Sequence, residues 1–410
     1  MQTGQRHASK ALASTILIIG FTLSCSSQED RAREEPASAP IVVVGAGISG
    51  LTTAKLLAKS GEEVVVLEAR ERSGGRLWTK SIGGAPIDLG GQWIHGVDDN
   101  PLARAFDAIG VAYQLHEPVP GRIYHESRGR QGGATLAQAF IAISTFENEI
   151  DRLREALGEN ASVAEGVLHL IELYELSDEL ADIWSFAINQ YLVELDYGGP
   201  ANLTSLAHIL NDEEFSGGDH LPSGGYTQLI DFLAEGLDIR FSQVVKSIDY
   251  NEVPIVVKTS DQSVEASKVV VTVPLGVLKA GVIEFAPSLP SEKVSAIERL
   301  GVSSLEKIVM RFDDTFWSHS SLGDAFFFVG NEPGELPLYI DYTESLGVPT
   351  LICYHGGQAS LDALASHDDD ELIERALQLL GLITEVEVPE PIETIVPRWR
   401  EDPFALGSYT

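Results

Sequence analysis

The feature that most constrains the fold is a glycine-rich turn between an apolar segment and a predicted helix. Residues 41–44 read Ile-Val-Val-Val, and such a β-branched run is typical of a buried parallel strand. Gly45, Gly47 and Gly50 follow in the spacing G-x-G-x-x-G. The first glycine permits a tight bend, the second lets a pyrophosphate approach the backbone, and the third lets the helix pack closely on the strand. The pattern therefore predicts a dinucleotide-binding turn.

The residues after the turn fit the same unit. The pattern predicts a helix over 51–60 and a second strand over 62–68. Glu68 ends this strand about 20 residues beyond the glycines, where a carboxylate binds a ribose diol. An acidic residue there argues against a 2′-phosphate and so against NADP. A glycine turn without a nucleotide is the alternative, and the surrounding strand, helix and acid disfavour it.

Two arginines follow Glu68 and indicate which dinucleotide, FAD or NAD, the site is expected to bind. Residues 68–76 resemble the extended fingerprint of the flavin amine oxidase superfamily, which includes monoamine oxidases, polyamine oxidases and flavin-dependent histone demethylases. The resemblance implies FAD, with Arg70 and Arg76 along its diphosphate and with Ser49 and Gly75 among the binding residues. Guanidinium groups suit this role because they fork onto phosphate oxygens. Without the resemblance, two arginines near a turn would indicate a solvated surface.

A second glycine pair lies further along. Gly90 and Gly91 precede Gln92, Trp93 and His95. In the amine oxidase family such a pair carries the chain under the flavin ring, where small residues are needed. The form Trp-x-His-Gly resembles the polyamine oxidase branch in particular. The resemblance implies FAD contacts for the first four residues and a substrate-facing role for His95, although a lone histidine is more often structural or exposed.

Composition limits the partners. The chain has 410 residues with 44% hydrophobic and 22% charged residues, which indicates a globular protein of two domains or one elaborated domain. A net charge of −33 disfavours nucleic acid and anionic membrane surfaces and attracts cationic amines, although plain solubility also explains it. The two cysteines predict neither a disulfide framework nor a zinc site, and no metal site is expected.

The N-terminus predicts export. Residues 1–25 form a leader with a basic start and a short apolar segment, and their end resembles a bacterial lipoprotein box in which Cys25 is the lipid-bearing residue. Thr22 departs from that box, so cleavage without lipidation and an uncleaved anchor are the alternatives. Residues 26–39 predict a disordered tether. The expected product is an exported bacterial protein, lipid-anchored or periplasmic.

The remaining segments predict an α/β fold in which a Rossmann-type FAD-binding domain is interleaved with an α+β substrate-binding domain. Residues 134–235 are acidic with helical apolar spacing. Residues 239–245 predict a strand, and by resemblance the backbone at Val245 meets the adenine. A hairpin over 248–273 and an antiparallel sheet over 307–354 follow, then an amphipathic helix over 369–380. The expected division assigns 40–105 and 236–285 to the FAD domain, 106–235 to the helical substrate domain, 286–395 to its sheet and helix, and 396–410 to a C-terminal FAD segment.

Three residues of the second half are candidates for chemistry. Lys307 opens a β-rich run, where a lysine is usually a solvated edge charge. The family places a lysine in this context, bonded through water to flavin N5. Trp399 and Tyr409 lie in a stretch resembling the family's W-x-x-D-P-x-x-x-G-S-Y motif. The resemblance implies an aromatic cage before the flavin, which suits a cationic amine.

The implied reaction is FAD-dependent oxidation of a small-molecule amine, in particular a polyamine, to an imine and then an aldehyde, with molecular oxygen reduced to hydrogen peroxide. Another FAD enzyme with the same fingerprint, such as a phytoene-desaturase-like protein, is one alternative. A non-catalytic remnant is the other, because the family's closing FAD segment would follow Tyr409 and the sequence ends at Thr410. That comparison predicts a truncated chain that binds FAD poorly.

Overall fold

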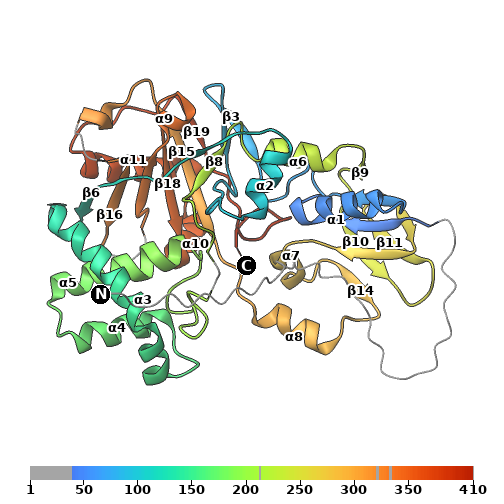
Figure 1. Ribbon diagram of the computed structural model, residues 1–410, viewed down its shortest axis with the longest axis horizontal. Coiled ribbons are helices and arrows are strands. Elements are labelled where there is room, and N and C mark those ends of the chain that lie inside the picture. The colour runs from blue at the N-terminus through green and yellow to red at the C-terminus, as the bar shows by residue number, and fades with distance from the viewer. Residues whose placement is uncertain (1–38, 212–213, 320–322, 332–334, 410) are drawn as a thin grey trace, which may run out of the picture.

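The computed structural model describes residues 39–409 apart from 212–213, 320–322 and 332–334 (Figure 1). The predicted leader and Cys25, and the tether up to residue 38, lie outside the described residues. Within the described part of the chain, no helix has the length and apolar character needed to cross a membrane. Figure 1 shows two halves side by side, with the parallel sheet and α1 in one half and the largest sheet with α11 in the other.

The first half is built on a parallel sheet in the order β13-β1-β2-β9. Its strands are β1 (Ile41–Val44), β2 (Val64–Leu67), β9 (Asp238–Arg240) and β13 (Lys268–Val271). One face, with Val43 and Val66, packs on α1 (Ile48–Lys59) and α6 (Thr227–Ala234). The other face, with Val42 and Val65, packs on a second sheet. The predicted β-branched strand is buried because both faces are covered.

The second sheet has the order β12-β11-β10-β14 and corrects two predictions. Its strands are β10 (Val245–Asp249), β11 (Ile255–Thr259), β12 (Ser263–Ala266) and β14 (Glu284–Ala286). The single strand expected over 239–245 is instead β9 and β10, because Ser242 turns the chain with a φ of 56°. The hairpin expected over 248–273 is instead the pair of hairpins β10-β11-β12, followed by β13 in the parallel sheet.

The second half is built on a seven-stranded sheet in the order β19-β15-β18-β17-β16-β6-β7. Its strands are β6 (Pro120–His125), β7 (Gly129–Gln131), β15 (Leu305–Arg311), β16 (Ala325–Val329), β17 (Leu338–Asp341), β18 (Thr350–Gly356) and β19 (Glu393–Ile395). The strands predicted over 307–354 all pair antiparallel, as expected, and β6, which the prediction did not include, pairs parallel with β16. The sheet therefore also recruits strands from the segment that we expected to be helical.

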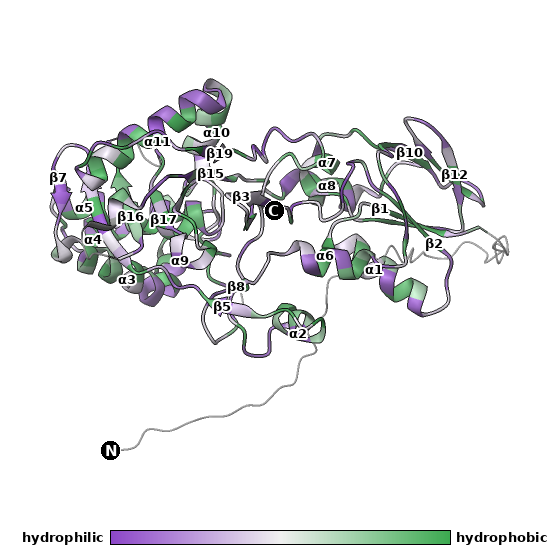
Figure 2. Ribbon diagram, turned by 90° about the horizontal axis from the view of Figure 1, so that it is seen from above, coloured by the Kyte–Doolittle hydropathy of each residue, from purple (hydrophilic) through white to green (hydrophobic). Residues whose placement is uncertain are grey.

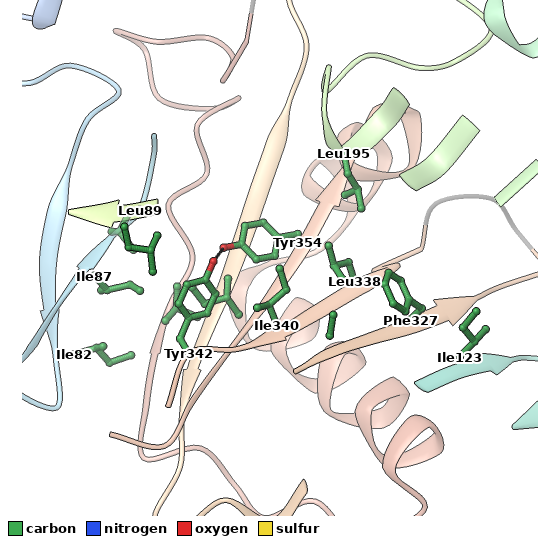
Figure 3. Close-up of a cluster of buried hydrophobic side chains, with 14 of the residues drawn as sticks. Ile82, Ile87, Leu89, Ile123, Leu195, Phe327, Leu338, Ile340, Tyr342 and Tyr354 are labelled. Carbon is green, nitrogen blue, oxygen red and sulfur yellow. Dashed lines mark hydrogen bonds between the residues drawn. The ribbon is translucent and has the colours of Figure 1, made fainter. Parts of the chain in front are cut away.

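Strict alternation along these strands separates two apolar cores. Ile308 and Met310 pack on α11 (Asp369–Thr384), which corresponds to the amphipathic helix predicted over 369–380. Val309 and Tyr354 face the other way, toward the core drawn in Figure 3. Because side chains on a strand alternate, Lys307 lies on the side of Val309. In Figure 2, α11 and α3 lie on opposite sides of this sheet.

Helices complete the second half. The prediction of helices over 134–235 holds for α3 (Gly133–Leu157), α4 (Val163–Leu173), α5 (Asp178–Ser185) and the π-helix η1 (Phe186–Leu195). The described residues of 196–226, which exclude 212–213, instead contain turns and β8 (His220–Pro222). Helix α6 packs on α1 in the first half. The sequence did not predict this partner, because apolar spacing reveals that a helix has a buried face but not which element covers that face.

The remaining elements are shorter. They are β3 (Thr79–Ile82), β4 (Ala85–Asp88), α2 (Pro101–Ala108), β5 (Tyr113–Leu115), α7 (Leu275–Lys279), α8 (Ser291–Arg299), η2 (Phe316–His319), α9 (Thr343–Leu346) and α10 (Gly357–Ser366). The predicted α/β class is confirmed.

Candidate active site

A cavity of about 580 Å³ runs from the glycine turn to the seven-stranded sheet. It begins at Gly45, Gly47 and Ser49, where β1 ends and α1 starts. A Cβ placed on Gly47 would meet no protein atom within 4 Å, whereas one on Gly50 would lie 1.9 Å from the Gly45 carbonyl oxygen. Gly47 therefore faces open space beside a helix N-terminus, and Gly50 holds α1 against the turn. This is the cradle that a dinucleotide diphosphate requires.

Glu68 lies at the cavity where the ribose was predicted. Its side chain is buried, with Oε2 accepting from the Ala46 N–H at 2.7 Å and Oε1 from the Arg70 N–H at 2.9 Å. A carboxylate has about four acceptor positions, so both oxygens can also accept from a diol. Val245 lines the same end of the cavity, and its contact with the adenine stays a prediction. The residues present fit FAD at this end.

The two arginines line the cavity but have protein partners. Arg70 Nη2 donates to Asp402 Oδ1 at 2.6 Å, and Arg76 Nη1 donates to the Ser408 carbonyl oxygen at 2.7 Å. Burial lowers the pKa of Arg76. Both side chains therefore attach the C-terminal segment to the dinucleotide half. Gly75 lies beside them, with its Cβ position 3.4 Å from Gly47 Cα. Their predicted contact with phosphate stays a prediction.

Lys307 is buried at the far end of the cavity, with 3% of its surface exposed. Its Nζ donates to the carbonyl oxygens of Asp88 at 2.8 Å and Gly90 at 2.9 Å, and to Gln92 Oε1 at 2.6 Å. Burial lowers the pKa of Lys307 to about 7, and the Asp88 charge opposes that change. The lysine is thus a buried titratable group facing the cavity, not a solvated edge charge.

Aromatic rings line this end. Trp399 is buried and donates from Nε1 to the Leu89 carbonyl oxygen at 2.9 Å. Tyr409 lines the cavity with 38% of its surface exposed. The Trp93 ring centroid lies 5.9 Å from Lys307 Nζ, but Trp93 and Gln92 are not among the residues that line the cavity. Gly91 lines the same region, so most of the residues predicted for the flavin and the cage meet in one cavity.

His95 lies apart from that cavity lining. Its side chain is 73% exposed, and its Nδ1 lies 3.0 Å from Asp219 Oδ2. The hydrogen bond with Asp219 raises the pKa of His95. His95 therefore forms an ion pair with Asp219 at the surface and is not a wall of this cavity, and its substrate-facing role stays a prediction.

Sequence reasoning missed a carboxylate near these groups. Asp196 follows η1, and desolvation by the surrounding protein raises its pKa to about 6, although it is solvent-accessible. Desolvation and then the charge of Asp196 raise the pKa of Tyr409 to about 12. The same carboxylate interacts with His95 and Asp219. π-helical segments occur frequently at functional sites, but their register cannot be read from apolar spacing.

The family follows from a direct match. A model of the family described as "Flavin containing amine oxidoreductase" matches residues 48–410. The chain belongs to this family. The resemblance on which the FAD prediction rested is thereby confirmed, and the glycine cradle and Glu68 fit that cofactor. Among the described residues, no group of His, Cys, Asp and Glu side chains could hold a metal ion.

Relatives from plants share about a third of their residues with this chain. FLOWERING LOCUS D of Arabidopsis thaliana is 32% identical over 399 residues, which cover 93% of this chain and 50% of that protein. Lysine-specific histone demethylase 1 homolog 2 of Oryza sativa subsp. japonica is 33% identical over 392 residues, 91% of this chain and 50% of that protein. The chain thus spans about half the length of these two relatives.

In two further comparisons the matched protein is closer in length to this chain. Probable polyamine oxidase 4 of Arabidopsis thaliana is 32% identical over 387 residues, 90% of this chain and 76% of that protein. A solved structure of putrescine oxidase bound to putrescine superposes with a TM-score of 0.71 at 22% identity, covering 91% of this chain and 87% of that one. That superposition establishes the shared fold.

Proposed function

We propose that the protein catalyses FAD-dependent oxidation of a small-molecule amine, in particular a polyamine, to an imine that hydrolyses to an aldehyde. The observation that carries the proposal is that the glycine cradle and the buried Lys307 line one cavity. Bound FAD would supply the two-electron acceptor, and transfer of those electrons to molecular oxygen would release hydrogen peroxide.

The chain's own residues would bind the cofactor, orient the amine and exclude water. Gly47 and Glu68 would hold the diphosphate and the ribose. Lys307 places its own side-chain nitrogen, as an ammonium or an amine, at the end of the cavity next to the seven-stranded sheet. Its pKa of about 7 lets it hold or release a proton near neutral pH. Trp399 and Tyr409 would shield the reacting carbon from water and present ring faces to a cationic nitrogen.

A polyamine fits the acidic surroundings of Tyr409. Asp196 interacts electrostatically with Tyr409, and Asp219 and Glu214 each interact with Asp196 and His95. Several carboxylates at spaced positions attract a chain with several ammonium groups more strongly than a single charge. A methylated lysine side chain on a peptide is the second candidate, supported by the histone demethylase relatives.

The test compares amines in the flavin-loaded protein. We expect spermine or spermidine to react fastest, then short diamines, with benzylamine and a dimethyl-lysine peptide poor. Added salt should slow the polyamines more than benzylamine because it screens the acidic field. A preference for benzylamine or an amino acid would reject the polyamine class, and preference for the peptide would favour the second candidate. A protein that takes up no flavin would support the non-catalytic alternative.

We also propose that the protein is exported and lipid-anchored at Cys25. The basic and apolar order of residues 1–25 supports this. Cys25→Ala should move the protein from the membrane fraction to the soluble fraction of a bacterial host, whereas Cys353→Ala should not. A wild-type protein that is already soluble and begins at another residue would contradict the anchor.

A further inference from the structure

Gln92 is the only side chain among the three oxygen acceptors that surround Lys307 Nζ in the described structure. The other two are backbone carbonyls of Asp88 and Gly90. An ammonium group has three N–H donors, so these acceptors satisfy its charged form completely. Backbone oxygens are fixed by the fold, whereas an amide at the end of a side chain can rotate. The orientation of Gln92 therefore decides whether the third acceptor is present.

Two tyrosines hold that amide. Tyr354 OH donates to Gln92 Oε1 at 2.9 Å, and the hydroxyl oxygens of Tyr342 and Tyr354 are 2.7 Å apart, as the dashed line in Figure 3 shows. A phenol has a single proton, and that of Tyr354 goes to Gln92. Tyr342 must then be the donor in the second bond. The resulting chain runs from Tyr342 through Tyr354 to Gln92, and each bond polarises the next.

Burying the hydroxyls of Tyr342 and Tyr354 costs folding free energy unless they form hydrogen bonds. Tyr342, Tyr354 and Gln92 are each at most 5% exposed, and both tyrosine rings belong to an apolar core. Phenylalanine would fill the same space without a polar group to bury. Tyr354 lies directly opposite Lys307 in the pairing of β15 with β18. The ring of Tyr342 stacks on that of His116 at 4.6 Å, so the chain is held at both ends.

We propose that Tyr342, Tyr354 and Gln92 are positioning residues that hold the Lys307 side chain in one orientation toward the cavity. The inference rests on the role proposed above for Lys307. Loss of the Tyr354 hydroxyl would free the Gln92 amide and remove an acceptor from the charged form of the lysine. A carboxylate at position 92 would instead stabilise that charge.

Few other titratable groups face this lysine. The Asp88 carboxylate is held by Thr79 Oγ1 at 2.5 Å and by the Tyr226 N–H at 3.1 Å. Burial raises the pKa of Tyr354 well above its usual value, so the phenol stays protonated. Burial raises the pKa of Asp88 and lowers that of Lys307, so these two groups titrate as a pair. Burial also lowers the pKa of His116, whose ring stacks on Tyr342.

The experiment measures the protonation of Lys307 directly. Trace acetylation of the full chain, with and without FAD, is followed across pH 5–10 by mass spectrometry, with the exposed Lys258 as internal reference. We expect Tyr354→Phe to lower the apparent pKa of Lys307 by about 0.5 unit and Tyr342→Phe by less. Gln92→Glu should raise it by about 1 unit.

A matched control is available on the other face of the sheet. Tyr339 is also buried and donates one hydrogen bond, to the Ala376 carbonyl oxygen at 3.0 Å. Tyr339→Phe should leave the Lys307 titration unchanged. A merely structural role for Tyr354 would likewise weaken folding without moving this titration. The pH dependence of urea unfolding, taken as the difference from Lys307→Met, reports the same titration without a labelling reagent, so occlusion of the lysine by FAD does not prevent the measurement.

The outcomes separate this inference from the proposed function. Titrations that shift in opposite directions for Tyr354→Phe and Gln92→Glu support the positioning, even if no amine is oxidised. Shifted titrations with unchanged pH profiles of amine oxidation would reject the role of Lys307 and keep the positioning. Folded variants whose Lys307 titrates as in the wild type would overturn the positioning.

Discussion

Alanine at Gly47 should separate cofactor binding from folding. Gly47 has a φ of −73° and a ψ of 175°, which alanine adopts without strain, and its Cβ would meet no protein atom within 4 Å. A compatible Gly→Ala change stabilises by about 0.4–1 kcal/mol through the unfolded chain, and alanine is a poorer N-cap by a similar amount. The free energy of unfolding should therefore change by less than about 1 kcal/mol.

FAD affinity should respond differently. The added methyl group would point into the space where the diphosphate must approach the backbone, so we expect at least a tenfold loss, about 1.4 kcal/mol. Gly50→Ala should show the reverse pattern, because its Cβ would lie 1.9 Å from the Gly45 oxygen and 2.8 Å from Thr272 Oγ1. Such overpacking costs about 1–3 kcal/mol or more of stability.

The assay pairs urea unfolding of the flavin-free protein with titration of FAD followed by flavin fluorescence. Gly132→Ala is the matched control, because Gly132 is also a helix N-cap with no atom within 4 Å of its Cβ position. It should change neither quantity by more than the N-cap effect. Wild-type FAD affinity in Gly47→Ala would refute the placement of the diphosphate, and a large loss of stability would refute the open space.

Three further changes test individual side chains. Glu68→Ala should weaken FAD binding on the order of 1.5–3 kcal/mol by removing a charge-assisted ribose contact, as measured by the same fluorescence titration. Lys307→Met should slow flavin reduction or reoxidation while FAD stays bound, as stopped-flow absorbance would show. The same variant should also lose the part of the pH dependence of stability that the Lys307 titration causes. Since the lowered pKa makes the unfolded chain bind more protons between about pH 7 and 10.5, wild-type stability should rise with pH there, by up to about 1.4 kcal/mol per unit. Parallel stability curves for the two proteins would contradict the buried titration. Asp196→Asn should remove the rise of kcat/KM with pH near 6 that ionisation of this carboxylate would cause for a cationic amine, and an unchanged profile would exclude Asp196 from binding.

Features that depend on residues close together in the sequence could be predicted from sequence patterns. The glycine turn and Glu68 are specified within about 30 residues, because the mechanism of nucleotide binding fixes their spacing. The direction of Lys307 follows from alternation along β15. The strand expected over 239–245 was wrong because β propensity does not reveal the turn at Ser242.

Contacts between distant segments could not be predicted in this way. The hydroxyl of Tyr354 meets Gln92 across 262 positions, and Arg70 meets Asp402 across 332. The sequence alone would suggest a core tyrosine and a phosphate-binding arginine at these positions. Only the packing of the two halves shows which polar group each side chain satisfies, and for that reason Asp196 was missed as well.

The pairing of β1 with β13 has a consequence for how the protein is made. Thr272 Oγ1 donates to the Val44 carbonyl oxygen across 228 positions, and β1 lies between β13 and β2 in the parallel sheet. On the ribosome, β1 and its glycine turn emerge long before β13 can join them. Until then β1 presents an open, apolar edge to the cell, and closing so long a loop is slow. Protection of this edge before β13 joins, rather than the final stability, should therefore limit the yield of protein that can bind flavin.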